Sequence, residues 1–421
     1  MKIDTKCVQE GYKPKDGEAR VLPIYQSTTF KYETCESLGD LFDLKKPGYF
    51  YTRLSNPTTA CVEKKIAELE GGVGAMLTSC GQSANMAAML NIAKAGDHIV
   101  CSDSIYGGTF NLAAVSLKNM GIETTFISPT SDYDTICKAI KPNTKLLFGE
   151  TLANPALTVL DIETFAKAAH DNNIPLIVDN TFATPINCRP FEWGADIITH
   201  SCTKYMDGHG AILEGAVVDS GNFDWTKGNF PELTEPDESY HGLIYTEAFG
   251  KAAYINKAVT GLMRDLGVCP SPFNSFLLNI GLETLHLRMK KHNENGLIIA
   301  KYLEDNPKVE WVSYPGLKSN PYYNLAQKYM PNGQSGVISF GVKGGKEKAL
   351  KVIDSLKLIC LVTHVATLTS GCIHPASTTH RQMTDEQLKA CGVPPEMIGL
   401  SVGIEDPEDL IADIEQALAQ I

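Results

Sequence analysis

The sequence predicts an α/β protein: a large domain around a mostly parallel sheet, followed by a smaller carboxy-terminal α+β domain. From about residue 55 to residue 260, short apolar runs of strand length alternate with helical stretches, which is typical of βα units. Pro270 and Pro272 then interrupt the pattern. Shorter strands and a terminal helix after Pro407 follow, which indicates a change of architecture.

The expected elements follow one another along the chain. Strands are expected at residues 75–78, 98–101, 124–127, 145–149, 175–179 and 197–199, and beyond the prolines at 337–340. Helices are expected at residues 62–69, 85–93 and 162–170, with one long amphipathic stretch at 276–303. Residues 1–54 lack sustained periodicity and suit an arm that lies on a neighbouring subunit. The predicted divisions are therefore 1–54, 55–260 and 261–421.

Composition favours a cytoplasmic protein that binds neither nucleic acid nor membranes. The 421 residues include 49 acidic and 37 basic side chains, a net charge of -12, and no basic patch to attract a polyanion. No apolar run approaches the roughly 20 residues of a membrane helix. Residues 1–6 lack the apolar core of a signal peptide. The twelve cysteines are scattered singly, which favours reduced thiols over disulfides or a metal site.

A lysine follows the strand expected at residues 197–199, in the segment 201–205 (SCTKY). A lone lysine in such a place is more often a surface side chain that extends to solvent. Here, Ser201 and Thr203 flank Lys204 with hydroxyl groups. These suit a phosphate held beside an amine that must lose its proton to form a Schiff base. The combination indicates a cofactor on Lys204.

Asp179 ends the strand expected at residues 175–179, at the sheet edge where parallel α/β proteins bind ligands. A carboxylate there can accept a hydrogen bond from a pyridinium nitrogen and keep that nitrogen protonated. Taken alone, Asp179 is better explained as a helix cap or a turn residue.

Two further turns offer an anion site and an aromatic ring. Residues 78–84 (TSCGQSA) place a glycine turn before a helix, whose free backbone N–H groups attract a phosphate. Tyr106 follows the next strand, where its ring could stack on a planar cofactor. An ordinary helix cap explains the first segment equally well, and a tyrosine buried in a turn explains the second.

Together these segments resemble the Cys/Met-metabolism family of pyridoxal-phosphate enzymes, over essentially the whole chain. The family includes cystathionine synthases and lyases, methionine γ-lyases and O-acylhomoserine sulfhydrylases. Besides the lysine segment, the resemblance rests on residues 23–28 (PIYQST), 51–58 (YTRLSNPT), 178–182 (VDNTF) and 374–380 (HPASTTH). It implies pyridoxal 5'-phosphate as the cofactor and the aspartate-aminotransferase-like fold, fold type I.

Three more stretches resemble the O-acetylhomoserine sulfhydrylase branch: 223–225 (FDW), 230–234 (FPELT) and 240–243 (YHGL). This branch joins O-acetylhomoserine to sulfide or a thiol by γ-replacement, giving homocysteine or a thioether and releasing acetate. That reaction is the first expectation. The alternatives are a γ-lyase that releases a keto acid and ammonia, a branch member with an altered substrate, and a catalytically silent protein that binds the cofactor.

The resemblance also implies roles for individual residues. Lys204 would form the Schiff base and move protons, Asp179 would pair with the ring nitrogen, and Tyr106 would stack on the ring and act as an acid near the leaving group. Asn154 would lie near the substrate or the ring oxygen. The other cofactor-binding residues would be Gly81, Gln82, Thr181, Ser201 and Thr203, with Tyr51 and Arg53 from a neighbouring subunit. This sharing implies a homodimer or homotetramer.

The sequence departs from the family pattern around the expected substrate. The family places an arginine, which clamps the substrate's α-carboxylate, where Gly399 stands here. His364 replaces the usual Asn or Ser, and Asp207 and Glu214 replace common glycines. One explanation is a substrate that lacks the α-carboxylate or has a cationic group facing these acids. Others are that Arg381 or His364 replaces the clamp, or that the acids reflect neutral drift on exposed loops.

Overall fold

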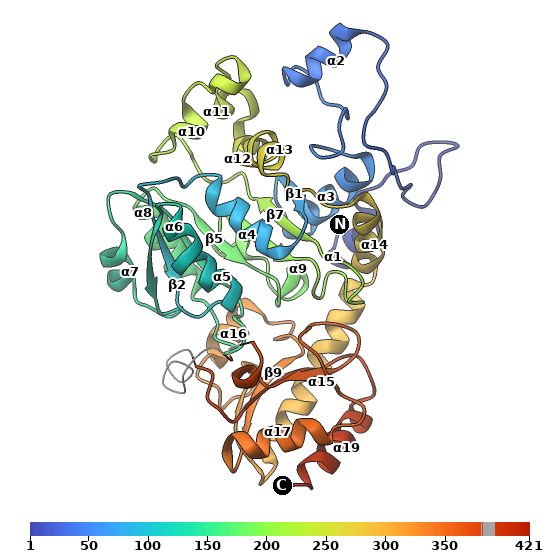
Figure 1. The fold of residues 1–421 in the computed structure, drawn as a ribbon, viewed down its shortest axis with the longest axis vertical. Coiled ribbons are helices and arrows are strands. Elements are labelled where there is room, and N and C mark those ends of the chain that lie inside the picture. Colours follow the sequence, from blue (N-terminus) through green and yellow to red (C-terminus); the bar gives the residue numbers. More distant parts are fainter. Residues whose placement is uncertain (380, 382–391) are drawn as a thin grey trace.

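The computed structural model of the chain describes residues 1–379, 381 and 392–421. The last residue of the motif 374–380 therefore lies outside the described residues. The described part contains two sheets with their covering helices, and Figure 1 shows the larger assembly above the smaller one.

A seven-stranded sheet forms the centre of the larger assembly. Its strands are β1 (Gly74–Thr78), β2 (His98–Ser102), β3 (Glu123–Ile127), β4 (Thr144–Glu150), β5 (Leu176–Asp179), β6 (Ile197–Ser201) and β7 (Gly215–Asp219). Their order is β1-β7-β6-β5-β4-β2-β3, and only β7 runs against its neighbours. The predicted α/β class with a mostly parallel sheet is confirmed. The prediction did not include β7.

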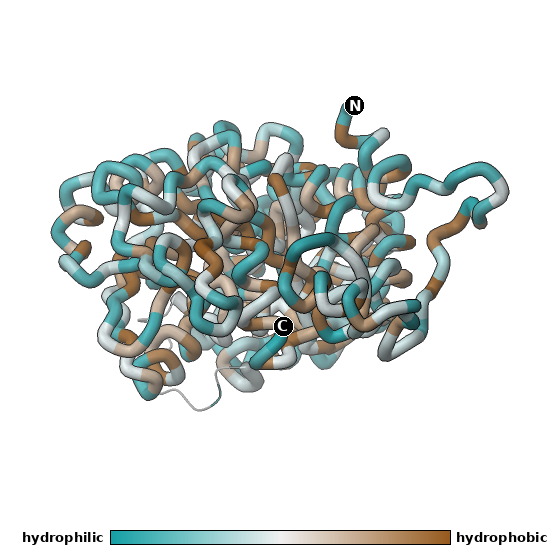
Figure 2. Tube along the Cα trace, turned by 90° about the horizontal axis from the view of Figure 1, so that it is seen from above, coloured by the Kyte–Doolittle hydropathy of each residue, from teal (hydrophilic) through white to brown (hydrophobic). Residues whose placement is uncertain are grey.

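Helices cover both faces of this sheet because its strands are apolar on both sides. In β4, Leu147 packs into one core while Leu146 and Phe148 pack into another, as expected for a buried parallel strand. Hydrophobic segments accordingly gather in the interior in Figure 2. The helices of this part are α3 (Pro57–Glu70), α4 (Gly81–Leu90), α5 (Gly107–Asn111), α6 (Leu117–Asn119), α7 (Tyr133–Ala139), α8 (Ile162–Asp171), α9 (Thr184–Asn187), α10 (Pro231–Thr234), α11 (Tyr245–Phe249), α12 (Ala253–Lys257) and α13 (Arg264–Leu266).

The smaller assembly has a five-stranded sheet of order β10-β11-β12-β9-β8. Its strands are β8 (Val309–Ser313), β9 (Val337–Val342), β10 (Cys360–Leu361), β11 (Gly371–Ile373) and β12 (Met397–Ser401). Its helices are α15 (Leu285–Asp305), α16 (Tyr323–Tyr329), α17 (Gly345–Ser355) and α19 (Pro407–Leu418). Helix α14 (Pro272–Glu283) precedes them in the chain but packs against α3 of the larger assembly. The stretch expected to be one helix at 276–303 is divided at Thr284, which leaves helical geometry with φ -108° and ψ 4°.

The amino-terminal arm includes α1 (Ile3–Gln9) and α2 (Cys35–Phe42). The segment around α2 stands off from the rest of the chain in Figure 1. Its aromatic rings contact one another, as Phe42 and Phe50 do at 4.4 Å between centroids. Earlier in the arm, Cys7 and Leu22 pack into the core of the larger assembly, so it is the segment around α2 that stands clear of this chain's core.

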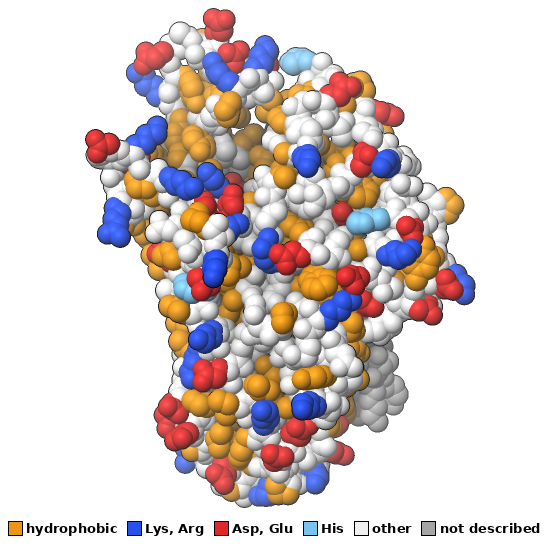
Figure 3. All heavy atoms as spheres, turned by 180° about the vertical axis from the view of Figure 1, so that it is seen from behind, with side chains coloured by type: hydrophobic (Ala, Val, Ile, Leu, Met, Phe, Trp, Pro, Cys, Tyr) orange, Lys and Arg blue, Asp and Glu red, His pale blue; other side chains and the backbone are white. Residues whose placement is uncertain are grey.

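The described helices include none with the length and apolar character needed to cross a membrane. On the face shown in Figure 3, basic and acidic side chains are interspersed rather than gathered by sign. That face offers no extended basic surface for a polyanion.

Candidate active site

The predicted site residues follow five strands that all end at the same edge of the large sheet. Strands β6, β5, β4 and β2 are parallel to one another, and β1 runs in their direction because both β1 and β6 are antiparallel to β7. Ligands of open α/β sheets bind beyond such carboxyl ends. The loops after these strands therefore bring together residues that are far apart in the sequence.

Lys204 lies in the turn that follows β6. Its side chain is partly buried, and its Nζ lies 3.3 Å from Nδ1 of His364. Burial lowers the pKa of the Lys204 ammonium group, because removing a cation from water favours the neutral amine. The interpretation of Lys204 as a surface lysine is therefore wrong. A lysine with a lowered pKa is suited to nucleophilic chemistry.

Asp179 lies at the end of β5, with both carboxylate oxygens held in place. Its Oδ1 accepts hydrogen bonds from N and Oγ1 of Thr181, at 3.0 and 2.5 Å. Its Oδ2 accepts from Nδ2 of Asn85 at 3.1 Å. Asp179 thus shapes its own turn and also presents a fixed carboxylate. The sequence analysis missed Asn85, although it lies one helical turn after Gly81 on α4, facing the same way.

Gly81 begins α4 directly against Ser201. A Cβ at Gly81 would lie 2.5 Å from Cβ of Ser201, so no other residue fits without displacing β6. The backbone N of Ser201 donates to Oγ1 of Thr181 at 2.8 Å, which links this contact to the Asp179 turn. Thr203 is buried, and its Oγ1 donates to the backbone oxygen of Glu214. The free N–H groups at the start of α4 could hold a phosphate.

Tyr106 follows β2 and stands at the start of α5. Its side chain is 51% exposed, so the alternative of a tyrosine buried in a turn is wrong. Its backbone N donates to Oε1 of Glu150 at 2.7 Å, and Nε2 of Gln82 donates to the Gly108 oxygen on the same turn. Burial and the nearby Asp179 raise the pKa of Glu150 well above its usual range. Sequence reasoning missed Glu150, although it directly follows the strand predicted at residues 145–149 and ends β4 as Asp179 ends β5.

The second sheet faces this edge through β9 and β12. Gly399 on β12 pairs with Ser339 on β9, so both positions point to the same side. Oγ of Ser339 donates to the backbone oxygen of Pro155 at 2.7 Å. This contact places Gly399 on the face that lies against the loop carrying Asn154, whose bond to Pro155 is cis.

Three predicted residues are not brought to this edge within the chain. Tyr51 and Arg53 are exposed on the arm, where the guanidinium lies 5.3 Å from the tyrosine ring centroid and Nη1 donates to the Arg264 oxygen. Arg381 is exposed, and its backbone N donates to the oxygen of Thr378. That Arg381 replaces the clamp when substrate binds stays a prediction.

Asp207 and Glu214 are 1% and 0% exposed, so the alternative of drift on exposed loops is wrong. Oδ2 of Asp207 accepts hydrogen bonds from the backbone N of His209 and of Ala211. Oε1 of Glu214 accepts from Oγ of Ser275 at 2.7 Å, while its Oε2 has no partner among the described residues. Burial raises the pKa of Glu214 to about 8, with smaller contributions from Glu63 and Asp207.

Substituting Glu214 with glutamine is expected to stabilise the apo-protein increasingly as pH rises. The pKa of Glu214 is about 8 in the folded chain and about 4.5 in the unfolded chain. Between these two pH values the folded chain binds one more proton than the unfolded chain, so the free energy of unfolding of wild type falls as pH rises through this range. Glutamine keeps an acceptor for Ser275 without the charge. Tm measured at pH 5 and pH 8.5 should therefore differ little from wild type at the lower pH. At pH 8.5 the free energy of unfolding of E214Q should exceed that of wild type by at least about 1 kcal/mol, which appears as a higher Tm.

Glu247→Gln is the control for this measurement because Glu247 is exposed. It should leave Tm unchanged at both pH values. An E214Q Tm that follows the wild-type value across the range would contradict the buried, protonated state of Glu214.

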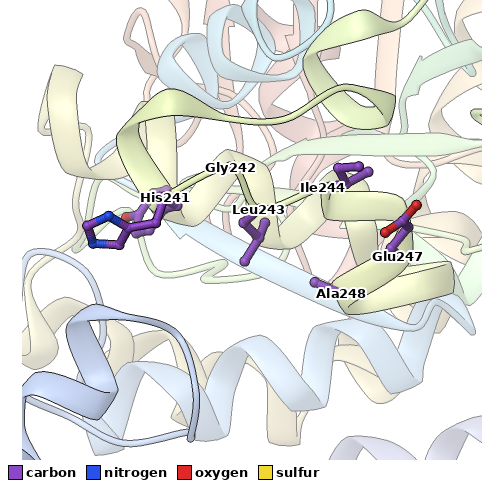
Figure 4. Close-up of a pocket in the computed structure, with 7 residues that line it drawn as sticks. His241, Gly242, Leu243, Ile244, Glu247 and Ala248 are labelled. Atoms are coloured by element: carbon purple, nitrogen blue, oxygen red, sulfur yellow. The ribbon is translucent and has the colours of Figure 1, made fainter.

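A surface hollow lies apart from this edge, on the segment that resembles the sulfhydrylase branch. It is lined by Tyr240, His241, Gly242, Leu243, Ile244, Glu247 and Ala248 (Figure 4). His241 points toward the arm, with Nε2 at 3.9 Å from Oδ1 of Asp43. All the residues that line this hollow lie between residues 240 and 248, and none of the predicted site residues is among them.

A mostly parallel sheet with a partly buried lysine, an aspartate and a glycine turn at its carboxyl edge defines a fold-type-I pyridoxal-phosphate enzyme. The chain belongs to the Cys/Met metabolism PLP-dependent enzyme family, whose profile matches residues 4–419.

Several relatives are similar over their full length. The homocysteine synthase of Schizosaccharomyces pombe is 46% identical, over 99% of this chain and 98% of its own. The O-acetyl-L-homoserine sulfhydrylase 1 of Thermus thermophilus is 44% identical, over 100% of both chains. A crystal structure from Campylobacter jejuni, described as an O-acetylhomoserine (thiol)-lyase, contains N'-pyridoxyl-lysine-5'-monophosphate. It matches with a TM-score of 0.96 and 37% identity over 100% of both chains.

Pyridoxal 5'-phosphate is thus the cofactor of this enzyme, and the residues present fit it. The missing Cβ of Gly81 keeps the start of α4 close to Ser201, where N–H groups and a hydroxyl can face a phosphate. Asp179 has a carboxylate already oriented by Asn85 and Thr181. Lys204 supplies a partly buried amine at the same edge.

Proposed function

We propose that this enzyme is an O-acetylhomoserine sulfhydrylase, which combines O-acetylhomoserine with sulfide or a thiol to give homocysteine or a thioether and acetate. The observation that carries the proposal is full-length similarity, at 44–46% identity, to relatives named for this activity. The lysine, aspartate and glycine turn at one sheet edge support it.

The residues of the site suit the steps of such a reaction. When bound, the cofactor withdraws electrons from the substrate's α-carbon, so that protons there become acidic enough for an amine to remove. Lys204 is the residue that moves these protons, because its pKa is lowered by burial. Asp179, oriented by Thr181, would hold the proton on the ring nitrogen. Gly81, Gln82, Ser201 and Thr203 would hold the phosphate, and Tyr106 would cover the ring and act as an acid at the leaving group.

The active site is completed by a second subunit in this proposal. Tyr51 and Arg53 are exposed on the arm, whose segment around α2 stands clear of this chain's core, and the fork of an arginine matches phosphate geometry. The arm of one subunit reaches the phosphate of its neighbour, which makes the protein at least a homodimer.

The cysteines suit a protein of the cytoplasm. They are reduced, including the exposed Cys35 and Cys360, as is usual for proteins of that compartment.

The test of the function is to supply the purified, cofactor-loaded enzyme with O-acetylhomoserine and sulfide. Homocysteine and acetate in equal amounts are the expected products. Formation of 2-oxobutyrate and ammonia without consumption of sulfide would instead identify a γ-lyase. A failure to turn over the substrate in either way would reject the proposal and favour another substrate or a silent cofactor-binding protein.

The Gly399 position favours a variation on this function, in which the α-carboxylate is held less tightly. A Cβ at Gly399 would lie 3.2 Å from Cγ2 of Ile373 and 3.8 Å from the Ile373 backbone oxygen, so a longer side chain fits β12 once the Ile373 side chain moves by a few tenths of an ångström. Gly399→Arg is expected to lower the KM for O-acetylhomoserine by about tenfold or more, because a charge-assisted pair contributes roughly 1.5–3 kcal/mol. Steady-state kinetics measures this change.

Gly399→Leu is the matched control, since leucine adds bulk without charge. It should leave KM unchanged or raise it. If KM for O-acetylhomoserine is the same in G399R and wild type, the missing arginine does not set how the substrate binds.

A further inference from the structure

The ring of His364 lies against the amine of Lys204. The two nitrogens, Nδ1 and Nζ, are 3.3 Å apart although 160 residues separate them in the sequence. Nε2 of the ring is buried and has no hydrogen-bond partner among the described residues. A neutral ring with its proton on Nε2 presents the free electron pair of Nδ1 to Lys204.

The segment that carries His364 is fastened to both sheets. The backbone N of Ala366 donates to Oγ of Ser401 on β12 at 2.7 Å, and Ala366 itself has a φ of +64°. The backbone N of Leu368 donates to the Gly208 oxygen in the turn after Lys204, at 2.8 Å. These contacts fix the ring in place, so its approach to Nζ does not depend on the conformation of a free loop.

The turn after Lys204 is shaped to receive the ring. A Cβ at Gly210 would lie 3.7 Å from Cδ2 and 3.8 Å from Nε2 of His364, which are ordinary contact distances, so this turn lies beside the ring and leaves it room. The charged groups that face the ring are Lys204 and the buried Asp207. Burial and the Lys204 charge lower the pKa of His364, while Asp207 and the backbone of Thr203 oppose this shift. The ring is therefore neutral near pH 7 and free to accept a proton.

We propose that His364 exchanges a proton with Lys204 during the reaction, an inference that rests on the proposed role of Lys204. The proton leaves Nζ of the ammonium group and bonds to Nδ1. The electron pair of the broken bond stays on Nζ, giving a neutral amine, and the ring becomes an imidazolium. The reverse transfer restores both groups, and no other reactant is needed. His364 thus makes Lys204 ready to act as a nucleophile and a base.

The first test follows Lys204 in the apo-protein, without turnover. Competitive acetylation with acetic anhydride across pH, read by mass spectrometry of the Lys204 peptide, reports the fraction of neutral amine. In wild type this curve should show two ionisations, one from Lys204 and one below pH 6.5 from His364. His364→Asn keeps an acceptor for Nζ but cannot take a proton. The acetylation curve of this variant should therefore show only the ionisation of Lys204. His364→Phe removes the acceptor and should also lower the Lys204 pKa by about one unit.

The second test separates proton exchange from positioning in the cofactor-loaded enzyme. H364N should lose about 10- to 100-fold in kcat, together with the acidic ionisation of the pH profile. In H364A, added imidazole should restore part of the rate in proportion to its free-base form. Thr363→Asn is the control, because Thr363 is the exposed neighbour of His364, and it should match wild type in both tests.

Two results would overturn the inference: an H364N acetylation curve with both wild-type ionisations, or an H364N enzyme with wild-type kcat and pH profile. In the second case, full activity with asparagine at position 364 would show that His364 only positions Lys204. Failure of the proposed function is distinguishable, because the wild-type enzyme would then form no homocysteine from O-acetylhomoserine and sulfide, while the acetylation curve of the wild-type apo-protein would still show both ionisations.

Discussion

Replacing Lys204 with alanine is expected to abolish turnover, with a loss in kcat of at least about 10³-fold. Lys204 is the residue proposed to bond to the cofactor and to move protons at the substrate, and a methyl group can do neither. The purified variant should also lose the visible absorbance that is expected of cofactor bound through a lysine. Both readouts are obtained from the same preparation, one by product assay and one by visible spectroscopy.

The control for this variant is Lys227→Ala, since Lys227 has a 70% exposed side chain that pairs with Asp224 on the surface. It should retain both the absorbance and the activity. Tm of the K204A apo-protein should stay close to wild type, because a partly buried amine without a carboxylate partner contributes little to stability. A K204A protein that still shows the lysine-bound spectrum would place the cofactor on another residue.

Much of the fold could be predicted because the strands carry a strong local signal. Strands such as β4 and β5 are buried along their whole length, and each contains an apolar run, at residues 146–148 and 176–178. Such short apolar runs predict buried strands. The same signal located Asp179 and Lys204, because each follows a strand whose end lies at the ligand edge. The long helical stretch at 276–303 was wrong in one respect. Amphipathic periodicity continues through Thr284, where the backbone breaks between α14 and α15.

The environment of individual side chains was harder to predict because it depends on contacts between distant segments. One alternative placed Glu214 on an exposed loop, but Glu214 is buried and accepts a hydrogen bond from Ser275 on α14, 61 residues away in the sequence. The contact between His364 and Lys204 depends on how the second sheet sits against the first. Asn85 gains its role only because α4 lies beside β5. No local pattern contains such information.

Replacing Asp179 with asparagine is expected to lower kcat by about 10²- to 10³-fold while the fold is retained. The amide has nearly the same shape, and its oxygen can still accept from Thr181, as Oδ1 of the carboxylate does at 3.0 Å. The negative charge is lost, however. A carboxylate favours protonation of a nearby ring nitrogen, and each unit by which that pKa falls corresponds to 1.36 kcal/mol. The variant should therefore bind the cofactor more weakly. The cofactor bound in it should also withdraw electrons less effectively from the substrate.

Kinetics with saturating O-acetylhomoserine and sulfide, combined with a titration of cofactor into the apo-protein, measures both effects of D179N. Asp171→Asn is the matched control, because Asp171 is a carboxylate on the surface that pairs with Lys167, and it should behave as wild type. The loss in D179N should persist at saturating cofactor, since the missing charge weakens the chemistry and not the binding alone. If added cofactor restores the full wild-type kcat, Asp179 only helps to retain the cofactor, and another group must protonate the ring nitrogen.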